Sequence, residues 1–391
     1  MHSKIFSLIL FLFILSNQLY SQQVGHTQIT FVDASRGNRS IQAEVYYPAT
    51  AAGNNTPIAA GVFPIIVFGH GFVMTTSAYQ NFWDDLVPEG YILALPSTEG
   101  GFAPVHADFG ADLNFLVGEI QTNGAGASVP STSVGNLSAI MGHSMGGGCS
   151  FLAAENNTSI TTMVSFAAAN TNPSSITAAQ MVSVPTLVFS GANDCVAPPP
   201  TQQDLIYDST SAAYKTQIYI TGGSHCYFAD YNFNCAFGEA TCSPSPTITR
   251  AEQHDATSVF LKLWLAYYLK GECSKAQEFQ DSLSSSPRIT FRQSQPIACT
   301  TGIQQELNAT DFSLHIFPNP AGDYLIIDVK RSAETDIAIY NMVGEKIKVN
   351  NFESQDAKNT LKIDVSGLKP GIYFVEVREL KKRWRGKFVW E

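Results

Sequence analysis

The chain has 391 residues, of which 45% are hydrophobic and 14% are charged, and its formal net charge is −10. This length and composition fit a globular protein of two domains and exclude a disordered chain. No lysine or arginine occurs between Arg39 and Lys215, which argues against nucleic-acid and nucleotide ligands, because phosphates need clustered cations, and favours an uncharged substrate.

Residues 1–21 have the pattern of a secretory signal peptide. Lys4 precedes an apolar run from Ile5 to Leu15, and Ser21 lies near a plausible cleavage point. The run is too short to cross a bilayer, so we expect no transmembrane segment in the mature chain. Export would place that chain in an oxidising compartment.

Short apolar runs that end in turn residues alternate with helix-like segments through residues 22–290. The strand-like runs are 42–48, 63–71, 91–97, 137–144, 161–169, 185–194 and 216–225. The helix-like segments include 108–120 and 255–271. Strands that are apolar on both faces and separated by helices are typical of a mainly parallel sheet covered on both sides. The expected fold of this part is therefore an α/β sandwich.

Residues 142–148, GHSMGGG, place four glycines around Ser144. Glycine tolerates left-handed dihedrals and close backbone approach, so the cluster indicates a sharp turn. A short apolar run, 136–141, precedes the turn, and a small-residue helical segment, 145–156, follows it. A strand, a tight turn with a serine and a helix form a nucleophile elbow. We therefore predict that Ser144 is a nucleophile.

A serine hydroxyl needs an imidazole to accept its proton and a carboxylate to orient that imidazole. In the elbow fold the three groups occur in the order Ser, Asp, His, each on a loop after a strand. Asp194 follows one apolar run and His225 follows the next. These two residues are the predicted acid and base.

The chain also contains competing acids and bases. The acids are Asp204, Asp208 and Asp230, which lie in polar or helical surroundings typical of solvated positions. The histidines are His106 and His254, expected at the surface or in packing, and His70, expected in another part of the site.

A tetrahedral intermediate carries a negative oxygen, and each backbone N–H aimed at it contributes about 3 to 4 kcal/mol. Met145, directly after the nucleophile, is one predicted donor. The second is expected in the loop GHGF, residues 69–72, after a strand. We predict Phe72, because the neighbouring glycines let its amide turn inward, with Gly71 as the alternative.

Seven cysteines fit an exported chain. Cys149, on the elbow helix, is expected to be a buried free thiol. The predicted pairs are Cys195 with Cys226, Cys235 with Cys242, and Cys273 with Cys299, although spacing alone does not decide the connectivity. No Cys-x-x-Cys pair or histidine cluster indicates zinc, and we expect neither a metal nor another cofactor.

Composition changes beyond Phe279. Residues 279–311 are rich in Ser, Gln, Pro and Thr without a sustained period, which predicts a tether, with 291–311 as an interdomain linker that contains a disulfide cysteine. Residues 312–391 alternate apolar and polar residues between turns, which predicts a small antiparallel β-sandwich.

The site motifs resemble those of bacterial cutinases and polyethylene terephthalate hydrolases of the α/β-hydrolase superfamily, most of all the Bacteroidetes polyester hydrolases. They are FGHGF at 68–72, GHSMGGGCS at 142–150, VPTLVFSGANDCVAP at 184–198 and GGSHCYF at 222–228. The resemblance implies a three-layer α/β-hydrolase sandwich and a secreted serine carboxyl-ester hydrolase that acts through an acyl-enzyme on apolar esters, with polyesters expected. It also implies that the side chains of Phe72 and Met145 contact the substrate.

Two stretches depart from that family. Residues 167–177 contain no aromatic residue, whereas the family commonly has a substrate-stacking tryptophan there. The segment after His225 is longer and more aromatic, with Tyr227, Phe228, Tyr231 and Phe233. These rings are expected either to line the cleft, with Tyr227 as a substrate contact, or to pack the loop onto the domain.

The C-terminal part resembles the sorting domain of the type IX secretion system. The phrases that carry the resemblance are FPNPAGDYLII at 317–327 and LKPGIYFVEV at 368–377. It implies contact with the secretion machinery and an extracellular or cell-surface location.

Other functions have less support. A lipase or general short-chain esterase would use the same three residues on other esters, and a peptidase has no positive feature. A non-catalytic surface-binding protein would not need the intact Ser, Asp and His. We expect the chain to be a monomer.

Overall fold

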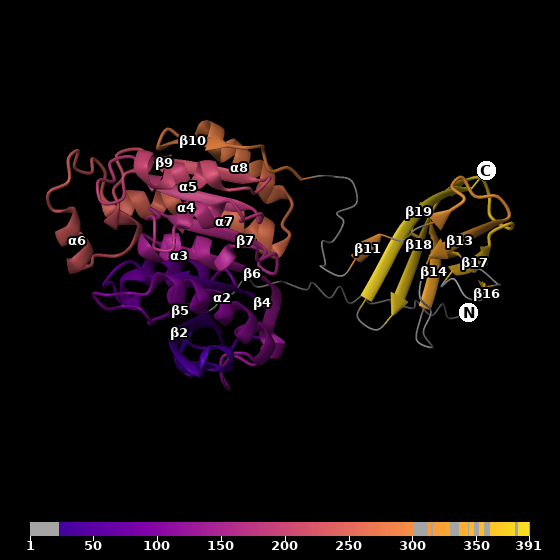
Figure 1. The fold of residues 1–391 in the computed structure, drawn as a ribbon, viewed down its shortest axis with the longest axis horizontal. Coiled ribbons are helices and arrows are strands. Elements are labelled where there is room, and N and C mark those ends of the chain that lie inside the picture. Colours follow the sequence, from indigo (N-terminus) through magenta and orange to yellow (C-terminus); the bar gives the residue numbers. More distant parts are fainter. Residues whose placement is uncertain are drawn as a thin grey trace, which may run out of the picture. The chain divides into compact units, whose positions relative to one another are not determined.

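We describe the protein from a computed structural model. It describes residues 23–299, 311–313, 316–328, 336–342, 344–347, 352–355, 360–379 and 382–390. The chain divides into two compact units, Met1–Cys299 and Thr300–Glu391 (Figure 1). The predicted signal peptide lies outside the described residues. Among the helices described, none is long and apolar enough to cross a bilayer.

A ten-stranded sheet runs through the first unit in the order β10-β9-β8-β7-β6-β4-β5-β2-β1-β3. Its strands are β1 (Gln23–Asp33), β2 (Arg39–Ala49), β3 (Gly53–Asn54), β4 (Phe63–Gly69), β5 (Ile92–Pro96), β6 (Val134–His143), β7 (Thr162–Phe166), β8 (Thr186–Gly191), β9 (Lys215–Ile220) and β10 (Ile289–Gln293). In the middle of the sheet, the adjacent strands β5, β4, β6, β7, β8 and β9 pair in parallel. At the two sides, β2 pairs with β5 and β10 pairs with β9, both antiparallel. The carboxyl ends of the parallel strands therefore meet at one edge.

Successive residues of the central strands face two different cores. In β4, Ile65 and Val67 belong to one buried cluster, whereas Ile66 and Phe68 belong to the other. Because strand side chains alternate between faces, a strand buried on both sides is apolar throughout. This pattern confirms the predicted α/β sandwich with a mainly parallel sheet.

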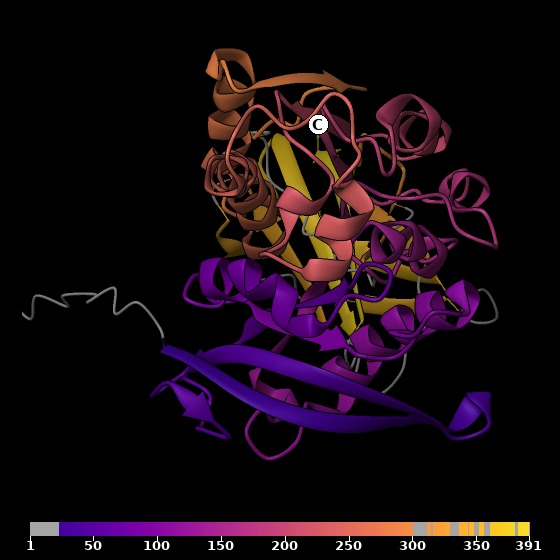
Figure 2. The same ribbon diagram turned by 90° about the vertical axis from the view of Figure 1, so that its left-hand side faces the viewer.

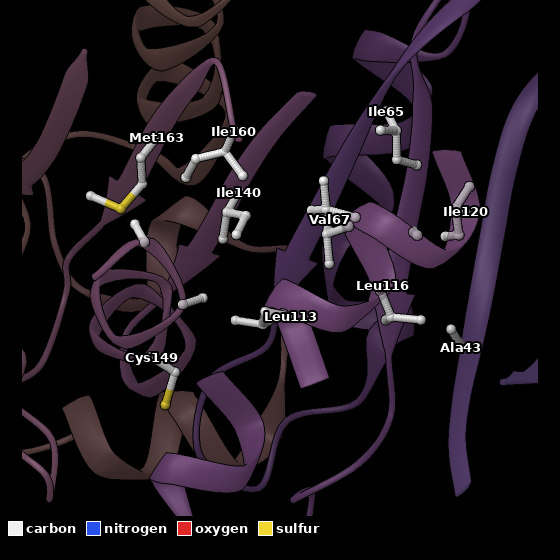
Figure 3. Close-up of a cluster of buried hydrophobic side chains, with 14 of the residues drawn as sticks. Ala43, Ile65, Val67, Leu113, Leu116, Ile120, Ile140, Cys149, Ile160 and Met163 are labelled. Carbon is white, nitrogen blue, oxygen red and sulfur yellow. The ribbon is translucent and has the colours of Figure 1, made fainter. Parts of the chain in front are cut away.

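Helices cover both faces of the sheet. They are α1 (Gln80–Leu86), α2 (His106–Asn123), α3 (Met145–Ala154), α4 (Ser175–Ala179), α5 (Gln203–Ser209), α6 (Phe233–Glu239), α7 (Arg250–Lys270) and α8 (Ser274–Ser285). Helices α2 to α5 contribute to the core of one face, and α1, α7 and α8 to the core of the other. Figure 3 shows the first core, where Leu113, Leu116 and Ile120 of α2 lie beside Ile65 and Val67.

Helix α7 begins five residues before the start of the segment predicted from the sequence, at Arg250. Thr249 and Glu252 form a capping box, in which each side chain accepts the backbone N–H of the other residue. Gly271 ends the helix in a left-handed conformation, with a φ of 68°. Both ends of this helix are therefore set by local sequence.

The prediction of a tether from Phe279 was wrong for residues 279–285 and 289–293. Helix α8 continues to Ser285, and residues 289–293 form β10. The helix buries Ala276, Phe279 and Leu283, one stripe of an otherwise polar sequence, and β10 is an edge strand, so few apolar residues mark either element. The first unit therefore extends to Cys299 rather than to residue 290.

The second unit contains a five-stranded sheet, β11-β19-β18-β14-β15, and a four-stranded sheet, β12-β13-β17-β16. The strands are β11 (Asp311–Ser313), β12 (Ile316–Phe317), β13 (Tyr324–Asp328), β14 (Asp336–Asn341), β15 (Lys346–Ile347), β16 (Phe352–Gln355), β17 (Thr360–Asp364), β18 (Gly371–Glu379) and β19 (Lys382–Trp390). Residues of both sheets, among them Leu325, Ile363, Val375 and Phe388, share one core. The predicted β-sandwich is confirmed, with β11 and β19 as a parallel pair.

Candidate active site

Ser144 lies in the turn between β6 and α3. Its φ of 56° and ψ of −119° are unusual for a residue other than glycine, and such strain is found at functional turns. A Cβ added to Gly146 would lie 2.1 Å from the carbonyl oxygen of Gly69, and one added to Gly142 would lie 2.3 Å from that of Gly146. The glycines around the serine are therefore needed because three backbone segments touch here.

His225 and Asp194 follow β9 and β8 at the same edge of the sheet. The Nε2 atom of His225 lies 2.9 Å from Ser144 Oγ, and its Nδ1 atom lies 2.8 Å from Asp194 Oδ2. Since a carboxylate only accepts, Nδ1 carries the proton and Nε2 is free to accept the serine proton. The structure thus brings the predicted nucleophile, base and acid into one hydrogen-bonded row.

Asp194 is held by its own loop. Its Oδ1 atom accepts the N–H groups of Val196 at 2.9 Å and Ala197 at 2.8 Å, which leaves Oδ2 for the imidazole. The carboxylate side chain is fully buried. A buried carboxylate in this position orients the ring and stabilises the imidazolium that forms when the serine loses its proton.

The two predicted oxyanion donors come from different parts of the chain. Met145 begins α3, and Phe72 follows β4. Among the described residues, neither of these N–H groups has an acceptor. The N–H of Gly71, the alternative donor, instead donates to the hydroxyl of Tyr79 at 2.6 Å. Phe72 and Met145 are therefore the pair left free to bind a negative oxygen.

Sequence reasoning missed two buried residues beneath the site, His143 and Tyr79. His143 Nε2 donates to the carbonyl of His225 at 3.0 Å, so its Nδ1 is unprotonated and accepts the Tyr79 hydroxyl at 3.1 Å. Together with the bond from Gly71 to Tyr79, these contacts link two loops. One follows β4 and carries Phe72, the predicted oxyanion donor; the other follows β9 and carries His225, and we call it the base loop. No spacing in the sequence marks such a link.

Burial sets the protonation of these two groups. It holds the pKa of His143 well below 6.5, and the nearby His225 lowers that pKa further. Burial also raises the pKa of Tyr79. Both side chains are therefore neutral at pH 7, which is the state their hydrogen bonds require.

The competing residues are occupied elsewhere. His70 contacts the carbonyls of Gly71 and Thr98, His106 accepts the N–H of Asn172, and His254 contacts the carbonyl of Ala229. Asp204 accepts from Gln217 and Tyr219, Asp208 pairs with Arg292, and Asp230 accepts the N–H of Asn81. None of these six side chains contacts Ser144 or His225.

The disulfides differ from two of the three predicted pairs. The prediction of Cys195 with Cys226 and Cys235 with Cys242 was wrong, because the structure joins Cys195 to Cys242 and Cys226 to Cys235. Cys235 lies in the first turn of α6, which returns it to the base loop, and Cys242 lies beyond the helix, beside the acid loop. The pair Cys273–Cys299 and the free, buried Cys149 are as predicted.

Each of the first two disulfides joins the α6 segment, residues 231–247, to the residue that directly follows the predicted acid or base. Glu239 at the end of α6 adds a polar contact, since its Oε1 atom accepts the N–H groups of His225 at 2.8 Å and Cys226 at 3.3 Å. The α6 segment thus touches both loops that orient the imidazole.

Two residues of α7 hold the base loop from the other side. Arg250 donates to the carbonyls of Cys226 and Ala229, and Gln253 bonds both the N–H and the carbonyl of Ser224. The guanidinium of Arg250 also lies 4.5 Å from the ring centre of Tyr227. The backbone on both sides of His225 is therefore fixed by side chains that the sequence motifs do not include.

The predicted substrate contacts differ in exposure. Phe72 is 46% exposed, Tyr227 is half-buried under Arg250, and Met145 is buried. A cavity of about 340 Å³ opens between α1 and α7, but its lining includes Asp84, His254 and Asp255 and none of the three hydrogen-bonded site residues. The site is therefore located by its hydrogen bonds and not by this cavity.

The described part of the chain contains no candidate metal site. Within the part of the chain that the structure describes, no group of three or more His, Cys, Asp or Glu residues is arranged to hold an ion. The hydrogen-bonded Ser144, His225 and Asp194, with two free N–H groups nearby, have the geometry for acyl transfer through a serine.

Comparison with known proteins agrees with this geometry. Residues 21–241 match a family model described as PET hydrolase-like, and residues 315–391 match one described as a secretion system C-terminal sorting domain. A segment of 98 residues is 30% identical to chlorophyllase-1, chloroplastic, from Citrus sinensis and to its counterpart from Citrus unshiu. That segment covers 25% of this chain and spans only 30% of the length of these curated relatives.

Proposed function

The chain belongs to the PET hydrolase-like family, and we propose that it is a secreted serine hydrolase that cleaves apolar carboxylic esters, polyesters among them, through an acyl-enzyme. Family membership supports an α/β-hydrolase that acts on carboxylic esters. The observation that carries the serine mechanism is the row of hydrogen bonds from Ser144 through His225 to Asp194.

In the first half of the reaction, Ser144 Oγ attacks the ester carbonyl carbon while His225 Nε2 takes the hydroxyl proton. Asp194 stabilises the imidazolium. Collapse of the tetrahedral intermediate breaks the bond to the alcohol oxygen, and the imidazolium returns its proton to that oxygen. The products of this half are the free alcohol and an acyl group on Ser144.

In the second half, water replaces the alcohol. His225 removes a proton from the water as its oxygen attacks the acyl carbon, and the proton then returns to Ser144 Oγ as the carboxylic acid leaves. In both halves the negative oxygen would accept the N–H groups of Met145 and Phe72, each of which contributes about 3 to 4 kcal/mol.

Several features support an uncharged, apolar substrate. The chain from residue 40 to residue 214 contains no cation, so a charged phosphate or carboxylate would find few partners there. Phe72, beside the free N–H groups, presents an exposed phenyl ring, which suits an aromatic or aliphatic acyl group.

The location agrees with a large substrate. The C-terminal sorting domain directs the chain to secretion or to the cell surface, in line with the resemblance to type IX sorting domains. A polymer cannot enter a cell, so an enzyme that attacks it must act outside. This agreement supports polyesters over small intracellular esters.

The first test is chemical. The wild-type protein should hydrolyse a p-nitrophenyl ester, and Ser144→Ala should abolish turnover with an unchanged far-UV circular dichroism spectrum. A variant that retains the wild-type rate would disprove the serine mechanism.

The second test separates polyester hydrolysis from lipase activity with the same residues. Products released from polyester film and from long-chain triglyceride emulsions are quantified by chromatography. We expect terephthalate or its esters from polyethylene terephthalate film at a rate that exceeds fatty-acid release. The opposite ranking would favour the lipase.

A further inference from the structure

Helix α6 exposes its aromatic residues. None of its seven residues is buried, and Phe233 and Phe237 are 69% and 75% exposed. Residues four apart lie on one face of a helix, and these two ring centres are 6.3 Å apart. Figure 2 shows α6, in pink, standing foremost on the face of the first unit turned toward the viewer. Two exposed phenyl rings contribute little to the stability of the fold, so their exposure side by side indicates an interaction site.

The helix is held in place by covalent and polar contacts instead of by an apolar core. Cys235 and Cys242 join it to the base and acid loops, and Asn232 accepts the N–H groups of its first turn. Asn234 Nδ2 donates to the carbonyl of Val73 at 2.8 Å. The aromatic face thus has a defined position and is left free.

The contact at Val73 joins α6 to the loop that carries Phe72. Val73 directly follows Phe72, which is 46% exposed and lies edge-on to Phe102, with 6.4 Å between ring centres. Phe102 is 86% exposed. We call Phe72, Phe102, Phe233 and Phe237 the aromatic rim.

We infer that the aromatic rim is the contact surface for a water-insoluble polyester, and that it holds chain segments or polymer surface outside the ester being cleaved. The inference rests on the ester hydrolase proposed above. Phe72 carries one of the free N–H groups at which that ester would react, and Asn234 of α6 contacts the next residue of the same loop, so one polymer chain can contact the site and the rim.

Charge also selects this occupant. The four rim residues are uncharged, and no lysine or arginine lies between residues 40 and 214 or between residues 216 and 249. The guanidinium of Arg250, which lies beside the loop joined to α6, is engaged by the carbonyls of Cys226 and Ala229. An anionic polymer would find no partner among the rim residues, whereas an uncharged polymer with phenyl or methylene groups can pack against the rings. The aromatic character of the rim favours polyesters over hydrated polysaccharides.

The test measures adsorption and chemistry separately. Phe233→Ala/Phe237→Ala is compared with Val62→Ala, which truncates a residue that is 65% exposed at the opposite end of β4 from the site. Adsorption to amorphous polyethylene terephthalate film is measured by depletion in the Ser144→Ala background, so that turnover does not interfere. Product release from film and kcat/KM for a soluble p-nitrophenyl ester are measured with Ser144 present.

We expect the double variant to lose about tenfold in adsorption and film hydrolysis, since two phenyl contacts are removed. Its soluble-ester kcat/KM should stay within about threefold of wild type, and Val62→Ala should match wild type in every assay. Because α6 buries no residue, the fold should be intact, and equal urea midpoints would verify this. Phe102→Ala, on another loop, should weaken adsorption independently.

The inference is overturned if the double variant adsorbs as well as wild type, or if Val62→Ala loses as much adsorption. It is also overturned if soluble-ester and film rates fall in parallel, because α6 would then act on the site itself. A wild-type protein that adsorbs to film through the rim but hydrolyses no soluble ester would refute the proposed function and not the rim.

Discussion

The carboxylate of Glu239 accepts the backbone N–H of His225 at 2.8 Å. The helix that presents this carboxylate is tied by disulfides to the loops of the acid and the base. The position of the imidazole relative to Ser144 therefore depends on a segment that contributes no side chain to the proton transfers.

Loss of this contact should slow catalysis without changing substrate binding. Hydrogen bonds to charged acceptors contribute about 1.5 to 3 kcal/mol, so we expect Glu239→Ala to lower kcat for a soluble ester about tenfold with little change in KM. Glu239→Gln keeps an acceptor oxygen and should retain most of the rate. Glu278→Ala, which removes a surface partner of Lys275, serves as the control. Equal rates for the Ala and Gln variants would contradict this positioning role.

The two disulfides of the α6 segment should differ in their effect on stability. Cys195–Cys242 spans 47 positions and Cys226–Cys235 spans 9. Because a longer loop restricts the unfolded chain more, paired Cys→Ser variants should cost about 4 kcal/mol for the first and about 3 kcal/mol for the second. Urea unfolding of both variants checks the order. A larger cost for the shorter loop would show that native contacts, not loop closure, dominate.

Two glycines should respond in opposite ways to the same substitution. A Cβ at Gly146 would lie 2.1 Å from the backbone oxygen of Gly69. Neither of these two backbone segments can move without disturbing the turn at Ser144. Gly146→Ala should therefore destabilise the first unit by several kcal/mol and abolish ester hydrolysis. Gly118, on the exposed side of α2, has open space around it, so Gly118→Ala should stabilise by roughly 0.5 to 1 kcal/mol. Thermal unfolding and a soluble-ester assay test both.

His143 should make stability depend on pH in the mildly acidic range. Its pKa is well below 6.5 in the folded chain, chiefly because of burial. Below pH 6.5 the unfolded chain binds a proton at this residue and the folded chain does not, so the free energy of unfolding falls as the pH falls. One such group contributes up to about 1.4 kcal/mol per pH unit.

The measurement is a series of urea unfolding curves between pH 7.5 and 5.5 for the wild type and His143→Gln. Glutamine can donate to the carbonyl of His225 but does not titrate, so the variant should show the shallower slope. His70, whose pKa is also lowered by burial, remains in both proteins. Identical slopes would show that His143 is protonated in the folded chain.

Local sequence patterns were enough to predict the order of the nucleophile, the acid and the base along the chain. The glycines beside Ser144, the apolar runs before Asp194 and His225, and the alternation of strands and helices are short-range features of the sequence. A parallel sheet converts them into one site, because the carboxyl ends of its strands share an edge. The hydrogen bonds among these three residues occur at the edge that this argument predicts.

Elements with few apolar residues were harder to predict. Helix α8 buries only three side chains, and β10 lies at the edge of the sheet, so the polar residues of both suggested a tether. In these elements pairing with β9 and packing against α7 decide the conformation, and neither contact is visible in the local sequence.

By itself, the sequence determined the fold class, the chain order of Ser144, Asp194 and His225 as the predicted nucleophile, acid and base, and the β-sandwich that follows, because each depends on hydrophobic periodicity or turn chemistry within a few residues. Only the tertiary structure decided the pairing of Cys195 with Cys242, the contact of Glu239 with His225, and the link from His143 to Tyr79. These contacts join residues that are far apart in the chain, and their partners are selected by distance and direction in the folded protein, which residue spacing does not encode.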